Sequence, residues 1–252
     1  MLKLVINLDR SPDRWAHAKA QLDRVGVDAQ RVQGVDGKLL TQDQLDHYNV
    51  PSNYPYKILC PRPLRAGEIG CFLSHQKCWE MLMRSEEKWA LIMEDDIILS
   101  DRAPTYMNNE DWIPDDVDFV NLWIFFDTWT SLCKKQKIIL KTGDELLWPI
   151  SPAHIGAPAY IISRRAAEFA LSLSERFPYP VDNFLFEWGP VAERFIPWCL
   201  NNPVVRTTGE PSTIHNNNKI RVRSPLSWQK IKFKTRREIA KAFAVKHEFK
   251  FF

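Results

Sequence analysis

An acidic triplet set between two apolar runs is the feature that most constrains this chain. Residues 89–93 and 97–99 are apolar, and Glu94, Asp95 and Asp96 separate them. An apolar run of this length predicts a buried β-strand. Burying three unpaired carboxylates beside it would be costly, so we expect a counter-charge there. A divalent metal is the simplest candidate, because hard cations bind oxygen ligands, and a solvated acidic turn is the alternative.

Side-chain alternation predicts how the triplet is arranged. Successive side chains of an extended chain point to opposite faces, so Glu94 and Asp96 are expected on one side and Asp95 on the other. Glu94 and Asp96 are therefore the carboxylates that we expect to act together.

The rest of the chain predicts an α/β fold. Residues 3–8 read as a first strand, Ser11 and Pro12 begin a helix that Gly26 ends, and residues 29–33 read as a second strand. Further strands are predicted at 89–93, 117–125, 137–140, 157–162 and 203–207, and further helices from 67, at 163–177 and at 181–188. This alternation is typical of an open, mostly parallel sheet flanked by helices.

Polar residues follow the first strands of this predicted sheet, where α/β proteins bind ligands. Asn7 and Arg10 follow the first strand, Asp36 follows the second, and the acidic triplet follows the strand at 89–93. Arg10 and Arg14 flank a helix N-terminus, which attracts anions, and could contact phosphates. The alternative is an ordinary helix with surface arginines. Asp36 could accept hydrogen bonds from a ribose, or could be a common turn aspartate.

Later residues add candidates for a catalytic cleft. Ser74 and His75 lie on the predicted helix before the acidic strand, where His75 either lines the cleft or is a packed core histidine. Asp182 follows a proline-rich break and is a candidate general base, a role compatible with capping the next helix; Glu187 is the second candidate. His215 is a candidate metal ligand or phosphate contact, and a loop histidine without a role is the alternative.

The charge is unevenly distributed along the chain. Residues 219–252 carry eleven Lys and Arg against two Glu, a net charge of +9, whereas the rest carries 23 basic and 29 acidic residues, a net charge of −6. Basic residues interleaved with aromatic ones predict contact with an anionic membrane surface. A solvated basic tail is the alternative. Nucleic-acid binding is not expected, because no nucleic-acid motif accompanies the charge.

Cysteine use and hydropathy predict where the protein works. The five cysteines are an odd number without a C-x-x-C pair, which indicates thiols in a reducing compartment. No apolar run approaches the roughly 18 residues that a transmembrane helix needs, and the chain shows no signal peptide. We expect a cytoplasmic protein with at most peripheral membrane contact.

Four segments taken together resemble glycosyltransferase family 25. They are residues 5–14 (VINLDRSPDR), 34–37 (GVDG), 67–75 (GEIGCFLSH) and 90–96 (ALIMEDD). The resemblance covers about residues 3–215 and implies a GT-A type nucleotide-sugar fold. We therefore expect a catalytic domain at 1–218, followed by the basic, aromatic-containing tail at 219–252 that the charge pattern indicates. It also implies a UDP-sugar donor, a divalent ion (usually Mn²⁺, otherwise Mg²⁺) and inversion at the anomeric carbon. Glu94 replaces the first Asp of a strict Asp-x-Asp motif, which leaves open which carboxylate binds the metal directly.

A division of roles follows as a hypothesis. The metal ligands are Glu94, Asp96 and His215, and the base that activates the acceptor hydroxyl is Asp182. The residues expected to bind the nucleotide sugar are Asn7, Leu8, Arg10, Arg14, Asp36, Ser74, His75 and Asp95.

The resemblance also implies a substrate class. We expect transfer of a hexose, galactose before glucose, to a lipid-linked lipooligosaccharide core at the cytoplasmic face of a bacterial inner membrane. A chain without a leader or an ER-retention tail favours this bacterial branch over the collagen-modifying one. A non-catalytic sugar-nucleotide or glycan-binding protein on the same fold is the rival, and it would not need the carboxylates.

Overall fold

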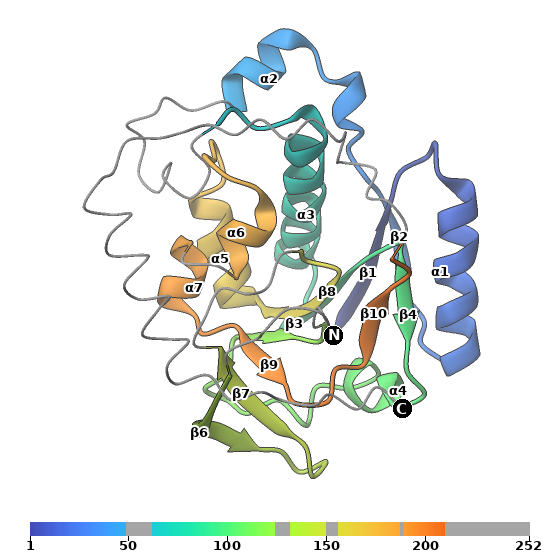
Figure 1. Cartoon of the computed structure of the whole chain (residues 1–252), viewed down its shortest axis with the longest axis vertical. Helices are drawn as coiled ribbons and strands as arrows, with labels where there is room; N and C mark the ends of the chain where they lie inside the picture. Colours follow the sequence, from blue (N-terminus) through green and yellow to red (C-terminus); the bar gives the residue numbers. More distant parts are fainter. Residues whose placement is uncertain (49–61, 124–131, 150–155, 187–188, 210–252) are drawn as a thin grey trace.

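An eight-stranded sheet forms the centre of the molecule (Figure 1). The computed structural model describes residues 1–48, 62–123, 132–149, 156–186 and 189–209. Along the sheet the strand order is β2-β1-β3-β8-β5-β9-β7-β6, and β10 and β4 form a separate two-stranded sheet. The strands are β1 (Leu2–Asn7), β2 (Gln30–Gln33), β3 (Trp89–Glu94), β4 (Ile97–Leu99), β5 (Phe119–Asn121), β6 (Leu132–Ile139), β7 (Glu145–Pro149), β8 (Ala159–Ser163), β9 (Trp198–Leu200) and β10 (Val205–Thr207).

Helices flank both faces of this sheet (Figure 1). They are α1 (Pro12–Val25), a short 3-10 helix η1 (Gly37–Leu39), α2 (Gln42–Tyr48), α3 (Ala66–Arg84), α4 (Ala103–Met107), α5 (Arg164–Ser172), α6 (Val181–Leu185) and α7 (Pro190–Arg194). Figure 1 shows α1 on one side of β1 and β3, with α3, α5, α6 and α7 on the other. None of the helices in the described ranges combines the length and apolar character that crossing a bilayer requires.

Strand direction confirms the predicted mostly parallel sheet. β1 is parallel to both β2 and β3, so the carboxyl ends of these three strands meet at one edge. β8 runs antiparallel to β3 and to β5, and β7 runs antiparallel to β9 and to β6. In the described sheet, β8 and β7 are therefore the reversed strands. The predicted strand at 117–125 is shorter, because β5 covers Phe119–Asn121, and the one at 137–140 belongs to the longer β6.

Alternating side chains of the central strands divide the core into two layers. Leu4 of β1 and Ile92 of β3 pack in the cluster on the α3 side. Their neighbours Val5 and Met93 pack in the cluster on the α1 side, and all four side chains are fully buried. Full burial of one aliphatic side chain contributes about 1.5–3 kcal/mol to the free energy of folding. The two layers thus hold β1 and β3 firmly in the middle of the molecule.

Helix boundaries follow the local sequence signals in α1 and only partly in α5. Gly26 ends α1 in the left-handed region, at φ 68°, as predicted. Ser163 caps α5, because its Oγ accepts a hydrogen bond from the backbone N–H of Ala166 at 3.1 Å. The prediction that α5 continues to Phe177 is wrong. The hydroxyl of Ser174 hydrogen-bonds the Leu171 carbonyl at 3.0 Å, a local contact that competes with helix continuation.

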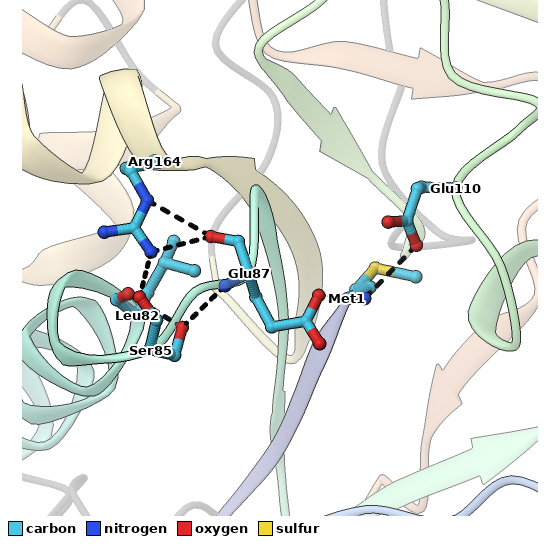
Figure 2. A network of polar contacts seen from close by, with 6 residues as sticks. All are labelled: Met1, Leu82, Ser85, Glu87, Glu110 and Arg164. Atoms are coloured by element: carbon cyan, nitrogen blue, oxygen red, sulfur yellow. Dashed lines mark hydrogen bonds and ion pairs between the residues drawn. The ribbon is translucent and has the colours of Figure 1, made fainter.

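A polar network fixes the end of the sheet opposite the polar strand ends (Figure 2). Arg164, the first residue of α5, donates hydrogen bonds to the carbonyls of Ser85 and Glu87, which link α3 to β3. The amino group of Met1 donates to the carboxylates of Glu87 and Glu110, at 2.6 and 3.2 Å. The beginnings of β1 and β3 are therefore tied to α5, which leaves their carboxyl ends as the open edge.

Candidate functional site

The carboxyl ends of β1 and β3 are joined through one buried amide. Asn7, the last residue of β1, donates from Nδ2 to Oδ2 of Asp95 at 2.7 Å and to the Ser11 carbonyl at 3.0 Å. Its Oδ1 accepts a hydrogen bond from Arg31 at 2.9 Å. Asn7 is 1% exposed, so its amide holds the first strand, the start of α1 and the acidic triplet together.

The acidic triplet does not alternate as predicted. β3 ends at Glu94, and the chain bends at Asp95 and Asp96 before β4 begins at Ile97. The bend breaks the two-residue period of the strand, so all three carboxylates line the same pocket. Oδ1 of Asp95 and Oδ2 of Asp96 lie 2.7 and 3.0 Å from the guanidinium of Arg14 on α1. The expectation that Asp95 points away from its neighbours is therefore wrong.

The triplet carries more negative charge than its surroundings neutralise. Burial and the charge of Glu94 raise the pKa of Asp96 to about 7, even though Arg14 is adjacent. Burial also raises the pKa of Asp95. Oδ1 of Asp96 is buried and has no hydrogen-bond partner among the described residues. A site with an orphaned buried carboxylate oxygen and unbalanced charge suits a divalent cation, which prefers oxygen ligands.

The turn after β2 brings Asp36 to the same edge. Its Oδ2 accepts a hydrogen bond from Nε of Arg10 at 2.5 Å, and its Oδ1 accepts one from the backbone N–H of Lys38 at 3.0 Å. Burial opposes ionisation, but these two hydrogen bonds lower the pKa of Asp36. Asp36 is therefore an ionised acceptor at the rim of the pocket.

Two glycines explain how this turn reaches α3. A Cβ on Gly37 would lie 1.8 Å from the carbonyl oxygen of Ala66, and a Cβ on Gly70 would lie 2.5 Å from that of Val35. Both approaches are far inside van der Waals contact, so only glycine lets the two backbones touch. Ser74 adds to this contact, because its Oγ accepts a hydrogen bond from the backbone N–H of Val35 at 2.8 Å.

His75 is both packed in the core and part of the pocket. The side chain is fully buried, and its Nδ1 lies 2.9 Å from the hydroxyl of Tyr160. That hydroxyl also accepts a hydrogen bond from Nε1 of Trp79 at 3.0 Å. On the other side of the ring, Nε2 lies 3.6 Å from Oε1 of Glu94. His75 is therefore a packed core histidine whose residue also lines this pocket.

One pocket, partly open to solvent, gathers most of the predicted residues. The predicted residues that line it are Asn7, Leu8, Arg10, Arg14, Asp36, Ser74, His75, Glu94, Asp95 and Asp96. The lining also includes residues that were not predicted, namely Ile6, Val35, Gly37, Gly67 and Cys71. Of these, Cys71 could have been predicted from helical spacing. It lies four residues before His75, which places both on the same face of a helix.

Asp182 is not one of the residues that line this pocket, although it interacts electrostatically with two of them, Glu94 and Cys71. It is in the first turn of α6, and its oxygens accept hydrogen bonds from the backbone N–H groups of Asn183 and Gly156 at 2.9 and 3.0 Å. Burial and the charge of Glu94 raise the pKa of Asp182. The carboxylate is therefore fixed in direction and is more basic than an exposed aspartate. Glu187, His215 and the tail 219–252 lie outside the described residues.

Comparison with known proteins identifies the family of this chain. The family model described as glycosyltransferase family 25 (LPS biosynthesis protein) matches residues 1–185. A glycosyltransferase 25 family member of Drosophila melanogaster is 40% identical over 97 residues, which are 37% of this chain and 15% of that protein. The lipooligosaccharide biosynthesis protein lex-1 of Haemophilus influenzae is 28% identical over 147 residues, 56% of this chain and 49% of that protein.

Among solved structures, a glycosyltransferase involved in the glycosylation of the major capsid of PBCV-1 is similar at a TM-score of 0.41. It shares 9% sequence identity, over 96% of this chain and 98% of that one. Because the family model covers well over half of the chain, the chain belongs to glycosyltransferase family 25. The alignments with the Drosophila and Haemophilus proteins span about half of the relative's length or less.

Proposed function

We propose that this chain transfers a hexose from a UDP-sugar to a hydroxyl of a saccharide acceptor, with inversion and with a divalent cation. The observation that carries the proposal is the convergence of Asp36, Arg10 and the acidic triplet on one pocket at the ends of β1, β2 and β3. Nucleotide ligands bind at such strand ends in α/β sheets.

Glu94 and Asp96 are the residues that would hold the cation. Both residues line the pocket, and Oδ1 of Asp96, which has no hydrogen-bond partner among the described residues, offers a ligand atom. When bound, a divalent cation such as Mn²⁺ or Mg²⁺ supplies positive charge for the diphosphate of the leaving group. Arg14 holds the two aspartates in place through its ion pairs with them.

The remaining pocket residues suit a nucleoside diphosphate. Ile6, Leu8 and Val35 offer an apolar wall on which a uracil ring can lie. Asp36 retains acceptor capacity for a ribose hydroxyl, because a carboxylate accepts about four hydrogen bonds and two are observed. Arg10 is 38% exposed and can reach a phosphate without losing its contact with Asp36.

Asp182 is the proposed base for the acceptor hydroxyl. A general base works best when its pKa is near the working pH, and burial raises that of Asp182. The two backbone N–H groups fix the direction of the carboxylate. A single displacement at the anomeric carbon needs this one base and no protein nucleophile, because the acceptor oxygen attacks directly as UDP leaves.

The acceptor is proposed from the relatives. The Haemophilus protein is named for lipooligosaccharide biosynthesis, and a procollagen galactosyltransferase 2 of Homo sapiens is 37% identical over 94 residues. We therefore favour UDP-galactose over UDP-glucose, with a lipid-linked lipooligosaccharide core as acceptor. The tail 219–252 would contact an anionic membrane at the cytoplasmic face. A non-catalytic binding protein would have no need for the acidic triplet.

A hydrolysis panel tests the proposal directly. Purified full-length protein is incubated with UDP-galactose, UDP-glucose and UDP-N-acetylglucosamine, and the release of UDP is measured with Mn²⁺ and with EDTA. The expected result is metal-dependent release that is fastest with UDP-galactose. Tight UDP binding without turnover of any sugar, in the presence of acceptor oligosaccharide, would instead identify a binding protein.

A further inference from the structure

We propose that Cys71, His75 and Glu94 form a binding site for a borderline-soft divalent cation, with Zn²⁺ the expected ion. Each residue offers one ligand atom, and the three atoms lie within 4.8 Å of one another. This donor set differs from the oxygen-only pair Glu94 and Asp96, and only Glu94 belongs to both.

The backbone brings the three donors close together. Cys71 and His75 are four residues apart on α3, so their side chains lie on the same face of the helix. Glu94, at the end of β3, lies opposite, with its Oε1 3.6 Å from Nε2 of His75. Tetrahedral zinc, with bonds of about 2.0–2.3 Å, keeps its ligand atoms about 3.3–3.8 Å apart. The 3.6 Å between Nε2 of His75 and Oε1 of Glu94 falls in that range.

The histidine is the second observation that points to a ligand. His75 is fully buried, and its Nε2 has no hydrogen-bond partner within the part of the chain that the structure describes. The nitrogen is directed toward Glu94 at a distance beyond a good hydrogen bond. On the far side of the ring, the hydroxyl of Tyr160 lies 2.9 Å from Nδ1, as outer partners of metal-binding histidines do.

The chemistry of the donors selects the ion. A thiolate and an imidazole favour Zn²⁺ and disfavour Mn²⁺ and Mg²⁺, which prefer oxygen. Three protein ligands leave a fourth position, and all three line the pocket, so that position opens toward it. The site does not depend on the proposed transfer reaction. One consequence rests on that function: Zn²⁺ would take Glu94 from the oxygen pair and inhibit Mn²⁺-dependent turnover.

Cobalt spectroscopy and zinc competition test the site on the full-length protein. Co²⁺ bound to a thiolate gives a sulfur-to-cobalt charge-transfer band, and Zn²⁺ affinity is measured against a chromophoric chelator. We expect the band in the native protein and its loss in Cys71→Ser. Both Cys71→Ser and His75→Gln should bind Zn²⁺ roughly 100-fold more weakly or worse, and Tyr160→Phe about 10–100-fold more weakly.

Matched controls separate this site from other thiols and from the oxygen pair. Cys78→Ala, on the same helix but in the core, and Cys199→Ala should both keep the band. Asp96→Asn should keep Zn²⁺ binding while losing Mn²⁺-dependent UDP binding. Zn²⁺ affinity therefore tests the zinc site, and UDP binding in Mn²⁺ tests the proposed function. A folded Cys71→Ser protein, checked by circular dichroism, that retains both the band and native Zn²⁺ affinity would overturn the inference. Cys71→Ala repeats the test if the serine variant does not fold.

Discussion

Arg14 and Asp96 form an ion pair 3.0 Å long that links α1 to the bend after β3. Both side chains are mostly buried, with 22% and 18% exposed. The same guanidinium also binds Asp95 at 2.7 Å. Its place near a helix N-terminus predicts phosphate binding for Arg14, whereas in the structure its guanidinium contacts two carboxylates. It is a counter-charge built into the acidic site.

Replacing Arg14 by Gln should therefore destabilise the metal-free protein. The two aspartates would lose their cation, and we expect a loss of about 1–3 kcal/mol in the free energy of unfolding at pH 8. Urea denaturation of the variant and of the native protein measures this loss of stability. Mn²⁺ should raise the Tm of the variant more than that of the native protein, because the cation replaces the missing charge.

Lys19→Gln is the matched control for this change. Lys19 is also on α1 and pairs with Asp23, but both side chains are more than half exposed. Its loss should cost less than about 0.5 kcal/mol. Equal effects of the two substitutions would show that the Arg14 ion pairs are not a buried counter-charge.

The raised pKa of Asp96 predicts a pH dependence with a definite sign. A carboxyl that titrates near 7 when folded and near its usual value of 3.8 when unfolded binds more protons in the folded state between those values. Stability without metal should therefore fall as the pH rises from about 4 to 7. Asp96→Asn should flatten this part of the profile, measured by urea denaturation at several pH values. A profile unchanged by the substitution would contradict the assignment.

Alanine substitutions at Gly37 and Gly34 form a matched pair that tests the turn after β2. Gly37→Ala would drive a Cβ into the Ala66 backbone, whereas at Gly34 the nearest atoms are the side-chain ends of Leu8 and Ile6, at 3.1 and 3.3 Å. We expect Gly37→Ala to cost more than about 3 kcal/mol and Gly34→Ala about 1 kcal/mol. Thermal denaturation compares them, and the reverse order would show that the turn does not depend on backbone contact.

Asp182→Asn tests the proposed base separately from donor binding. The carboxylate is outside the lining of the pocket, so the KM for the UDP-sugar should change little. Loss of the base should lower kcat by about 10²–10⁴-fold. Asp115→Asn, at an exposed position, is the control. Steady-state kinetics with an acceptor saccharide gives both constants, and an unchanged kcat would eliminate Asp182 as the base.

Short-range signals were sufficient to predict the frame of the site. Apolar runs located β1 and β3, and proline and glycine located the ends of α1, because these signals act over a few residues. Because β1, β2 and β3 are parallel, their carboxyl ends meet at one edge of the sheet. This topology explains why Asn7, Asp36 and Glu94 lie together there.

Long-range contacts were out of reach of the same reasoning. The hydroxyl of Tyr160 lies against His75 from 85 residues away, and no local pattern indicates such a partner. Arg14 could be placed at the start of a helix, but its pairing with the triplet depends on how α1 packs. The bend at Asp95 reversed the expected side-chain direction, because alternation holds only while the strand continues. The three-residue strand β9 was also missed, since pairing with β5 and β7 defines it.

The central claim is that Glu94 and Asp96 hold a cation that binds the diphosphate of a UDP-sugar. Calorimetric titration of UDP in Mn²⁺, with native protein, Asp96→Asn and Asp101→Asn, tests it most directly. Asp101 follows β4 closely but is 90% exposed and pairs with Arg24, so it is the control. The account predicts Mn²⁺-dependent binding that Asp101→Asn retains and Asp96→Asn weakens more than about 100-fold. Native affinity of Asp96→Asn for UDP in Mn²⁺ would contradict it.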